Sequence, residues 1–238
     1  MVKKILPGLG IIALLVVSGG LLFYMQSSPR FEIARVGIRG HSHLTPEMIV
    51  NRLNLQPHTN IFQVRLDLLE KQLEALTWIK RAQVYRNFPN KLSIAITERT
   101  PFALVKLDEL HLVDREGVVL GALTSGDALH LPILTGSLVE QIAMDRTNPQ
   151  LGEALHEIAA LLNSSTPWLT NIRKIEIECL ENVTFFPHDQ SPEIRMSLRN
   201  YQDNLPRLEQ IASDLPEENI ASIDLRFDRR IVVTPKKI

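Results

Sequence analysis

Hydrophobic residues form one long run near the start of the chain and shorter periodic patterns after it. The run from Ile5 to Met25 holds 21 residues and no charge, the length of a helix that crosses a ~30 Å hydrocarbon core. Lys3 and Lys4 precede the run, which is also typical of a cleaved signal peptide. Because the run continues past the small residues 18–20 and no Ala-x-Ala site follows, we expect an uncleaved transmembrane helix at 5–25.

The two sides of this helix carry similar charge, so charge alone does not set its orientation. Three arginines between residues 30 and 39 offset two lysines and the terminal amine on the other side. Long domains cross membranes largely regardless of their charge. We therefore expect a cytoplasmic tail at 1–4, a linker at 26–30 and the remaining ~210 residues outside the cytoplasm, held at the inner (plasma) membrane.

A first strand and a short helix are predicted after the linker. The apolar positions of the strand change register near Ala34–Arg35, which suggests a bulge. These positions are Phe31, Ile33, Val36 and Ile38. Thr45 followed by Pro46 is an N-cap and first-turn pair. This pair opens a helix that buries Ile49 and Leu53.

A second helix and a hairpin complete this region. Asp67 and Glu70 have the spacing of a capping box, and the helix aligns its apolar residues on one face. The run 79–86 is rich in strand formers, 87–90 is a turn signal, and an alternating strand follows. The predicted order for residues 31–99 is β-α-α-β-β, with both helices covering one face of a three-stranded sheet. The apolar face of the second helix consists of Leu69, Leu73 and Leu76.

Residues 98–101, Glu-Arg-Thr-Pro, end this first region. Proline cannot donate to a strand ladder and restricts the residue before it, so a domain boundary near residue 100 is expected. Residues 100–238 are then predicted to form a mixed β-rich domain with two or more helices. Asn148 and Pro149 cap the first helix, and the second is expected at about 205–215. The apolar stripe of the first helix consists of Leu151, Leu155, Ile158 and Leu162.

Short strands surround these two helices. Three are expected at 103–105, 111–113 and 118–120, with a turn at 114–117. Two more follow the first helix, and each turns three apolar residues to one side. These residues are Ile175, Ile177 and Cys179 in one strand, and Ile194, Met196 and Leu198 in the other. The predicted fold class is α+β, with a single transmembrane helix followed by two domains.

Composition narrows the classes of function. The formal net charge is -1 and the isoelectric point about 6.7, which gives no electrostatic footprint for nucleic acid. A single cysteine cannot form an intrachain disulfide, so the outer domains must depend on their cores. The sequence has no G-x-S-x-G, phosphate-loop or paired zinc motif.

Three groups of reactive side chains favour structural interpretations. His41 and His43 alternate in a loop without an evident third ligand, so solvated histidines are preferred to a metal site. Cys179 is in phase with apolar strand residues and is expected to be a small buried hydrophobe. Three carboxylates of the second predicted helix are expected to cap it and face solvent rather than do acid–base work; they are Asp67, Glu70 and Glu74. We predict no catalytic, metal or cofactor site, no small-molecule substrate and no enzymatic activity.

The chain ends in a strongly strand-forming segment. Apolar and charged residues alternate over 223–228, and the β-prone run 230–234 follows a turn at Asp228–Arg229. A last strand has no successor to cover it, so its backbone groups are expected to form an open sheet edge; an interior strand with ordinary core residues is the alternative. An open edge accepts a partner's strand by β-augmentation. The candidate contacts in this run are Arg230, Ile231, Val232 and Val233.

The run 79–86 is a second candidate edge, on the sheet of the first domain. Its candidate partner contacts are Arg81, Val84 and Arg86. Ordinary core and surface positions explain this strand better than a partner site.

Several short motifs follow one another along the chain: Trp78-Ile79-Lys80, Phe88-Pro89, Glu98-Arg99-Thr100-Pro101, Leu112-Val113-Asp114 with Gly117, Leu131-Pro132 with Gly136, and Ile223-Asp224-Leu225-Arg226. In this order, behind an anchor, they resemble the FtsQ/DivIB family of bacterial division proteins. The resemblance covers essentially the whole chain and implies a POTRA domain at 31–99 and an FtsQ-type β domain at 100–238. The turn at Asp228–Arg229 departs from the pattern, because family members often have glycine there.

The resemblance implies a non-enzymatic scaffold of the divisome at the division septum. Such a scaffold contacts FtsB-like and FtsL-like single-pass proteins through its β domain and helps to control septal peptidoglycan synthesis. The resemblance also matches Arg226 and Phe227 to positions near the partner-contacting edge. A POTRA-type, chaperone-like component of a secretion or outer-membrane assembly system is the alternative, although such proteins normally carry repeated POTRA units or a barrel. An anchored cell-wall hydrolase is a third class, for which the sequence offers no catalytic machinery.

Overall fold

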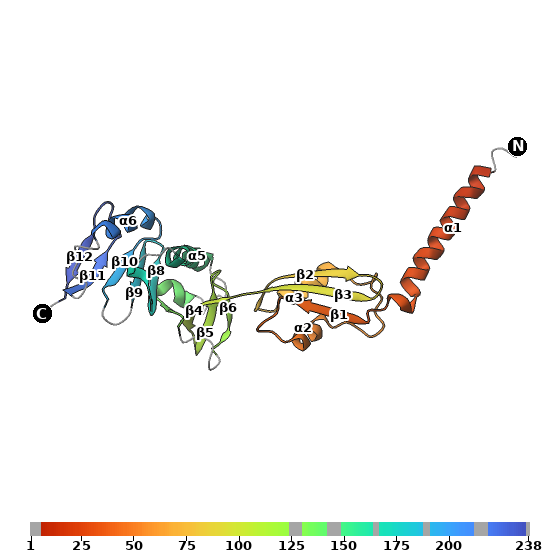
Figure 1. The fold of residues 1–238 in the computed structure, drawn as a ribbon, viewed down its shortest axis with the longest axis horizontal. Coiled ribbons are helices and arrows are strands. Elements are labelled where there is room, and N and C mark those ends of the chain that lie inside the picture. The colour runs from red at the N-terminus through yellow and green to blue at the C-terminus, as the bar shows by residue number, and fades with distance from the viewer. Residues whose placement is uncertain are drawn as a thin grey trace. The chain divides into compact units, whose positions relative to one another are not determined.

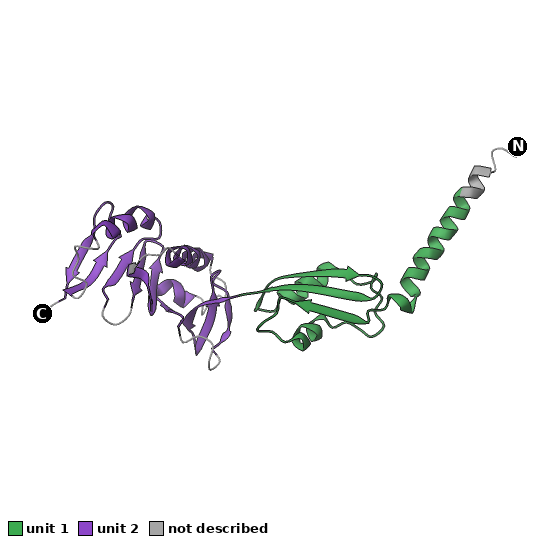
Figure 2. Ribbon diagram, in the orientation of Figure 1, with its two compact units in different colours: residues 1–99 green, residues 100–238 purple. Residues whose placement is uncertain are grey.

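The computed structural model describes residues 6–123, 130–141, 149–163, 167–187, 191–211 and 219–236, with the side chains of the N-terminal helix described from Ile11 onward. The chain divides into two compact units, Met1–Arg99 and Thr100–Ile238 (Figure 2). Four predictions lie outside the described residues: the tail 1–4, the start of the apolar run at Ile5, the Asn148 cap, and the end of the second helix at 212–215.

Unit 1 contains a long N-terminal helix and a small α/β sandwich (Figure 1). Its elements are α1 (Leu6–Ser27), the short 3-10 helix η2 (Pro29–Phe31), β1 (Arg35–Arg39), α2 (Pro46–Leu53), α3 (Leu66–Glu74), β2 (Ile79–Asn87) and β3 (Lys91–Glu98). The sheet order is β1-β3-β2, with β1 parallel and β2 antiparallel to the central β3. The predicted order β-α-α-β-β is confirmed. Within the described part of the chain, no helix has both the length and the apolar character needed to cross a membrane.

Both helices of the sandwich pack on the same face of the sheet. Ile49 and Leu53 of α2 and Leu69 and Leu73 of α3 share one core with alternate residues of β2 and β3. α2 starts as predicted, because the Thr45 hydroxyl accepts the N–H of Met48 at 3.3 Å. The apolar faces that the helical repeat and the strand alternation create therefore pack together in one buried layer.

Two details of unit 1 differ from the prediction. The first strand begins at Arg35 rather than Phe31, which lies in η2. The capping box at Asp67 and Glu70 is wrong, because α3 begins at Leu66 and no side chain caps it. Glu70 instead hydrogen-bonds to strand β2, a partner that sequence spacing does not reveal.

The strands described in unit 2 form a single nine-stranded sheet in the order β12-β11-β10-β9-β8-β7-β4-β5-β6. The strands are β4 (Pro101–Lys106), β5 (Leu110–Asp114), β6 (Val119–Ala122), β7 (Ile133–Thr135), β8 (Lys174–Cys179), β9 (Asn182–Phe186), β10 (Glu193–Met196), β11 (Ile220–Asp224) and β12 (Val232–Pro235). The helices are α4 (Ser137–Glu140), α5 (Pro149–Asn163), the 3-10 helix η4 (Pro167–Leu169) and α6 (Tyr201–Ile211). The α+β class with a β-rich second unit is confirmed.

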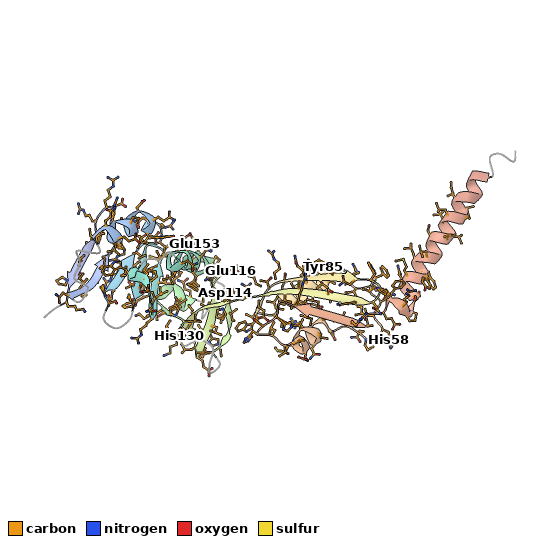
Figure 3. The ribbon with its side chains drawn as sticks, viewed as in Figure 1. His58, Tyr85, Asp114, Glu116, His130 and Glu153 are labelled. Carbon is orange, nitrogen blue, oxygen red and sulfur yellow. The ribbon has the colours of Figure 1, made fainter. Side chains whose placement is uncertain are left out.

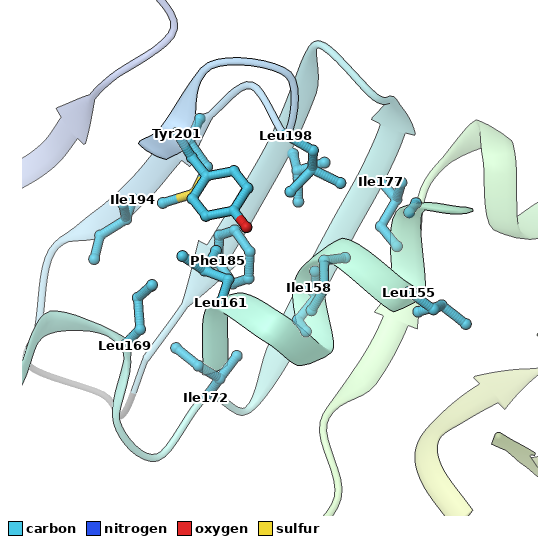
Figure 4. Close-up of a cluster of buried hydrophobic side chains, with 14 of the residues drawn as sticks. Leu155, Ile158, Leu161, Leu169, Ile172, Ile177, Phe185, Ile194, Leu198 and Tyr201 are labelled. Atoms are coloured by element: carbon cyan, nitrogen blue, oxygen red, sulfur yellow. The ribbon is translucent and has the colours of Figure 1, made fainter. Parts of the chain in front are cut away.

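The core of unit 2 forms between α5 and the middle of the sheet. Leu155, Ile158 and Leu161 of α5 belong to one hydrophobic cluster with Phe185 and Ile194 of the sheet (Figure 4), and all five side chains are buried. The predicted stripe placed Leu162 on this face, but Leu161 is fully buried there and Leu162 is only half-buried. This core supports the half of the sheet that ends in β12.

Three further predictions for unit 2 need correction. Cys179 is exposed rather than buried, because the β8–β9 register shifts between Ile177 and Cys179 and changes the face that the thiol occupies. Strands β7 and β9 were not predicted. Helix α6 starts at Tyr201, before the predicted residue 205, because Tyr201 adds a buried turn ahead of Leu205.

Candidate partner-binding site

Strand β12 lies at one end of the nine-stranded sheet and pairs antiparallel with β11. In this pairing Val233 lies opposite Ile223, and Val232 lies opposite Asp224. Ile231 and Val233 pack against the core of unit 2, whereas the side chain of Val232 is 45% exposed. The strand is therefore attached to the sheet by its core-facing side chains and by one of its two edges.

The hydrogen bonds of β11 determine which backbone groups of β12 face outward. The N–H of Leu225, directly after β11, donates to the carbonyl of Arg195 in β10 at 2.7 Å, so Leu225 is turned toward β10. Neighbouring residues in a strand direct their N–H and C=O groups to opposite edges, so Asp224 is turned toward β12. Val232, opposite Asp224, therefore bonds to β11, and Val233 directs its N–H and C=O away from the sheet.

The far end of the strand gives the same assignment. The N–H of Lys236 donates to the carbonyl of Asn219 at 2.8 Å, so Lys236 is turned toward β11 and Pro235 is turned outward. Proline is tolerated at this position because its missing N–H would otherwise point to solvent. The outer edge of β12 thus presents the N–H of Val233 and ends at a residue that cannot donate.

The turn before β12 is held by a polar network. Arg226 donates to both carboxylate oxygens of Asp224, with the shortest contact 2.6 Å from Nη2 to Oδ2, and to Asn182 Oδ1 at 3.0 Å. Burial by itself raises the pKa of Asp224, but the hydrogen bonds from Arg226 outweigh it and hold that pKa below its ordinary value. The predicted contact residue Arg226 therefore fixes the turn and is only partly available to a partner.

Two further predicted contacts lie on the surface of the turn. Phe227 is 49% exposed and Arg230 is exposed, so both side chains are accessible in the turn. Arg229 has a φ of 56°, the left-handed conformation that favours glycine. The turn can therefore form with arginine at a position where the sequence pattern led us to expect glycine.

Asn204 is a structural residue of this site that the sequence did not indicate. It is 1% exposed on α6, and its Nδ2 donates to the carbonyls of Leu225 at 2.8 Å and Phe227 at 3.4 Å. These two hydrogen bonds join α6 to the end of β11 and to the turn into β12. The only sequence signal is a polar residue directly before the buried Leu205.

Strand β2, the second candidate edge, is covered by its own unit. The N–H of Ala82 donates to Glu74 Oε1 at 3.1 Å and the N–H of Val84 donates to Glu70 Oε1 at 2.8 Å. Of the predicted contacts, Val84 is buried and Arg81 is exposed. Arg86 donates to the carbonyls of Ile61 and Val64. Glu74 is exposed, as expected, and Glu70 is half-buried, but the expectation missed that both carboxylates accept outward donors of β2.

The histidine loop is held by one carboxylate. Glu98 accepts the Ser42 hydroxyl at 2.7 Å and the N–H groups of His43 and Leu44 at 2.8 and 3.0 Å. The His43 ring stacks on Trp78 with centroids 3.6 Å apart. Burial raises the pKa of Glu98, but these hydrogen bonds outweigh it and lower that pKa. In the part of the chain that the structure describes, no three His, Cys, Asp or Glu residues group to hold a metal.

Comparison with known proteins identifies the two units. Residues 31–99 match the family described as "POTRA domain, FtsQ-type", and residues 103–226 match "Cell division protein FtsQ/DivIB, C-terminal". The cell division protein FtsQ of Syntrophotalea carbinolica is 29% identical over 94% of this chain and 79% of its own length. That of Myxococcus fulvus is 28% identical over 91% and 77%, and that of Anaeromyxobacter sp. is 30% identical over 85% and 69%. The chain therefore belongs to the FtsQ/DivIB family of cell division proteins.

Proposed function

We propose that this protein is a non-enzymatic scaffold of the bacterial divisome that binds single-pass partners, FtsB-like and FtsL-like, by strand addition at β12. The observation that carries the proposal is the outward N–H and C=O of Val233 on the terminal strand of the sheet. A partner strand that pairs there continues the ladder without displacing any contact described for β12. Through such partners the scaffold would help to control septal peptidoglycan synthesis.

Side chains around Val233 supply specificity in this proposal. Val232 and Phe227 are exposed beside the edge and offer apolar contacts, while Arg230 adds a positive charge in the turn. Ile231 and Val233 face the core and keep the strand in place. The partner would therefore contact one face of β12 and the turn that precedes it.

The proposed organisation has five parts: a cytoplasmic tail at 1–4, a membrane anchor at 5–25, a linker at 26–30, the POTRA domain at 31–99 and the β domain at 100–238. The anchor rests on the charge-free sequence run, which begins ahead of the first described side chain of α1. Exposure of apolar residues around the helix, such as Leu15 at 66% and Phe23 at 73%, supports it, because such a surface is stable in lipid. Both outer domains would then lie outside the cytoplasm.

Two substitutions at one position test the proposal. Val233→Pro and Val233→Ala both remove side-chain volume, but only proline removes the outward N–H. We expect the full-length Val233→Pro protein to bind a partner's strand at least tenfold more weakly, about 1.4 kcal/mol, and Val233→Ala to bind nearly as well as the unchanged protein. Binding is measured by titration with the protein in nanodiscs, and circular dichroism checks folding. Wild-type affinity in a folded Val233→Pro protein would refute strand addition at β12.

A further inference from the structure

The end of helix α1 is joined to the POTRA unit by a buried amide. Asn60 is 5% exposed, and its Nδ2 donates to the carbonyls of Met25 and Gln26 at 2.9 Å each. Its Oδ1 accepts the N–H of Phe62 at 2.9 Å. These carbonyls are among the last four of α1, which have no partner within the helix. Asn60 therefore fixes one end of the POTRA unit against the end of α1.

Four aromatic side chains continue from α1 along this end of the unit, and we call them the aromatic row. The ring centroids are 6.3 Å apart between Tyr24 and Phe31, 5.2 Å between Phe31 and Phe62, and 5.1 Å between Phe62 and Phe88. Tyr24 is 54% exposed on α1 and Phe88 is 61% exposed at the β2–β3 turn. The row thus begins on the apolar surface of α1 and ends in an exposed ring.

Basic residues flank the aromatic row. Arg30 follows α1 in η2, and Arg35 pairs across the sheet with Lys91, next to the β2–β3 turn. The acidic residue of this end, Glu32, is bonded to His58 at 2.7 Å, and Figure 3 shows His58 at the end of unit 1 next to α1. Aromatic rings with nearby Arg and Lys are the composition that membrane interfaces favour.

We propose that the aromatic row docks this end of the POTRA domain onto the interfacial layer of the bilayer, with the Phe88 ring inserted among lipid headgroups. The inference rests on the proposed function in one respect, that α1 is the membrane anchor. The Asn60 bonds hold the row beside α1, so insertion of Phe88 adds little ordering cost. Docking would limit the rotation of the POTRA domain about its anchor.

Spin labels in the full-length protein test this inference. Cys179→Ser removes the exposed natural thiol, and single cysteines are then placed at Val17 in α1, at Phe88, where the apolar nitroxide ring takes the place of the phenyl ring, and at Thr97 as a control. Thr97 is exposed near the opposite end of β3, about 20 Å from its start. The protein is reconstituted in vesicles of phosphatidylethanolamine and phosphatidylglycerol. Collision of each label with oxygen, which concentrates in lipid, is compared with collision with a water-soluble nickel chelate.

We expect labels at 17 and 88 to collide preferentially with oxygen and the label at 97 to collide with the nickel chelate. A lipid-exposed label at 17 with an aqueous label at 88 would overturn the docking while leaving the anchor intact. An aqueous label at 17 would refute the anchor itself. A label at 88 that is shielded from both reagents would show that protein, rather than lipid, covers the row, and would also overturn the inference.

Discussion

Strands β2 and β12 are both edge strands, but among the described residues side-chain acceptors are found only for the outward N–H groups of β2. In β2, the outward N–H groups of Ala82 and Val84 are held by Glu74 and Glu70 of the adjacent helix α3. In β12, the outward N–H of Val233 follows from the pairing with β11, and no bond to it is among those found in the described residues.

The difference shows that position in a sheet does not by itself make a binding site. Exposed edges invite association, and proteins cover or charge those that are not used. Here α3 covers β2 with two carboxylates one helical turn apart. β12 instead ends at Pro235 and is followed by Lys236, and both residues limit how far a new strand can pair. We therefore expect partners to bind at β12 rather than at β2.

The largest effect is expected from Asn204→Ala. This change removes the donor to the buried carbonyl of Leu225 and should destabilise unit 2 by about 1–3 kcal/mol. It also loosens the turn into β12, so partner binding should weaken while unit 1 is unaffected. Chemical denaturation and partner titration measure both effects. Gln202→Ala, at an exposed position of the same helix, is the matched control, and an equal loss in the two variants would contradict the role of Asn204.

A smaller effect is expected when the covered edge is opened. Glu70→Ala combined with Glu74→Ala frees the N–H groups of Val84 and Ala82 and should destabilise unit 1 by about 1–2 kcal/mol. The opened edge should also promote self-association, measured by light scattering. Asp67→Ala is the control on the same helix, because the Asp67 carboxylate pairs with the exposed Arg65 rather than with β2 and such surface pairs contribute little. If the double variant stays as stable and monomeric as the control, the carboxylates do not protect β2.

The smallest effect concerns pH. The pKa of Glu98 is lowered in the folded protein, so its stabilising contribution is present above its ordinary pKa of about 4.3 and is lost as pH falls through the lower folded value. Glu98→Gln should therefore remove this loss of stability of unit 1 at acidic pH. The loss of stability of unit 2 that Asp224 causes at acidic pH should remain. The unfolding temperatures of the unchanged protein and of Glu98→Gln are measured at a series of pH values from neutral to acidic. Parallel curves at all pH values would contradict this assignment.

Much of the fold could be predicted because local signals agree. Alternation at Leu92, Ile94 and Ile96, the Thr45–Pro46 cap and the spacing of Leu69 and Leu73 all indicate one small sandwich. The exposure of Cys179 could not be predicted, because a single extra residue in a strand moves the next side chain to the other face. The periodicity of apolar residues in the sequence does not reveal such bulges.

The candidate site was predicted only in part for a related reason. A strongly β-prone last run indicates an edge strand, and β12 is one. Which donors of that strand face outward depends on the hydrogen bonds of β11, which the sequence does not contain. Likewise, Glu70 and Glu74 read as a helix cap and a solvated face until α3 is placed beside β2, and Asn204 has no partner until α6 lies beside the end of β11.

Hydrogen exchange of single amides distinguishes the two edges. We expect the amides of Ala82 and Val84 to be protected in the free full-length protein and to remain unchanged when a partner binds. The amide of Val233 should exchange rapidly in the free protein and slow markedly in the complex, because it joins a new ladder. Protection that appears at Ala82 and Val84 upon binding, with Val233 unchanged, would place the partner on β2 and contradict the account.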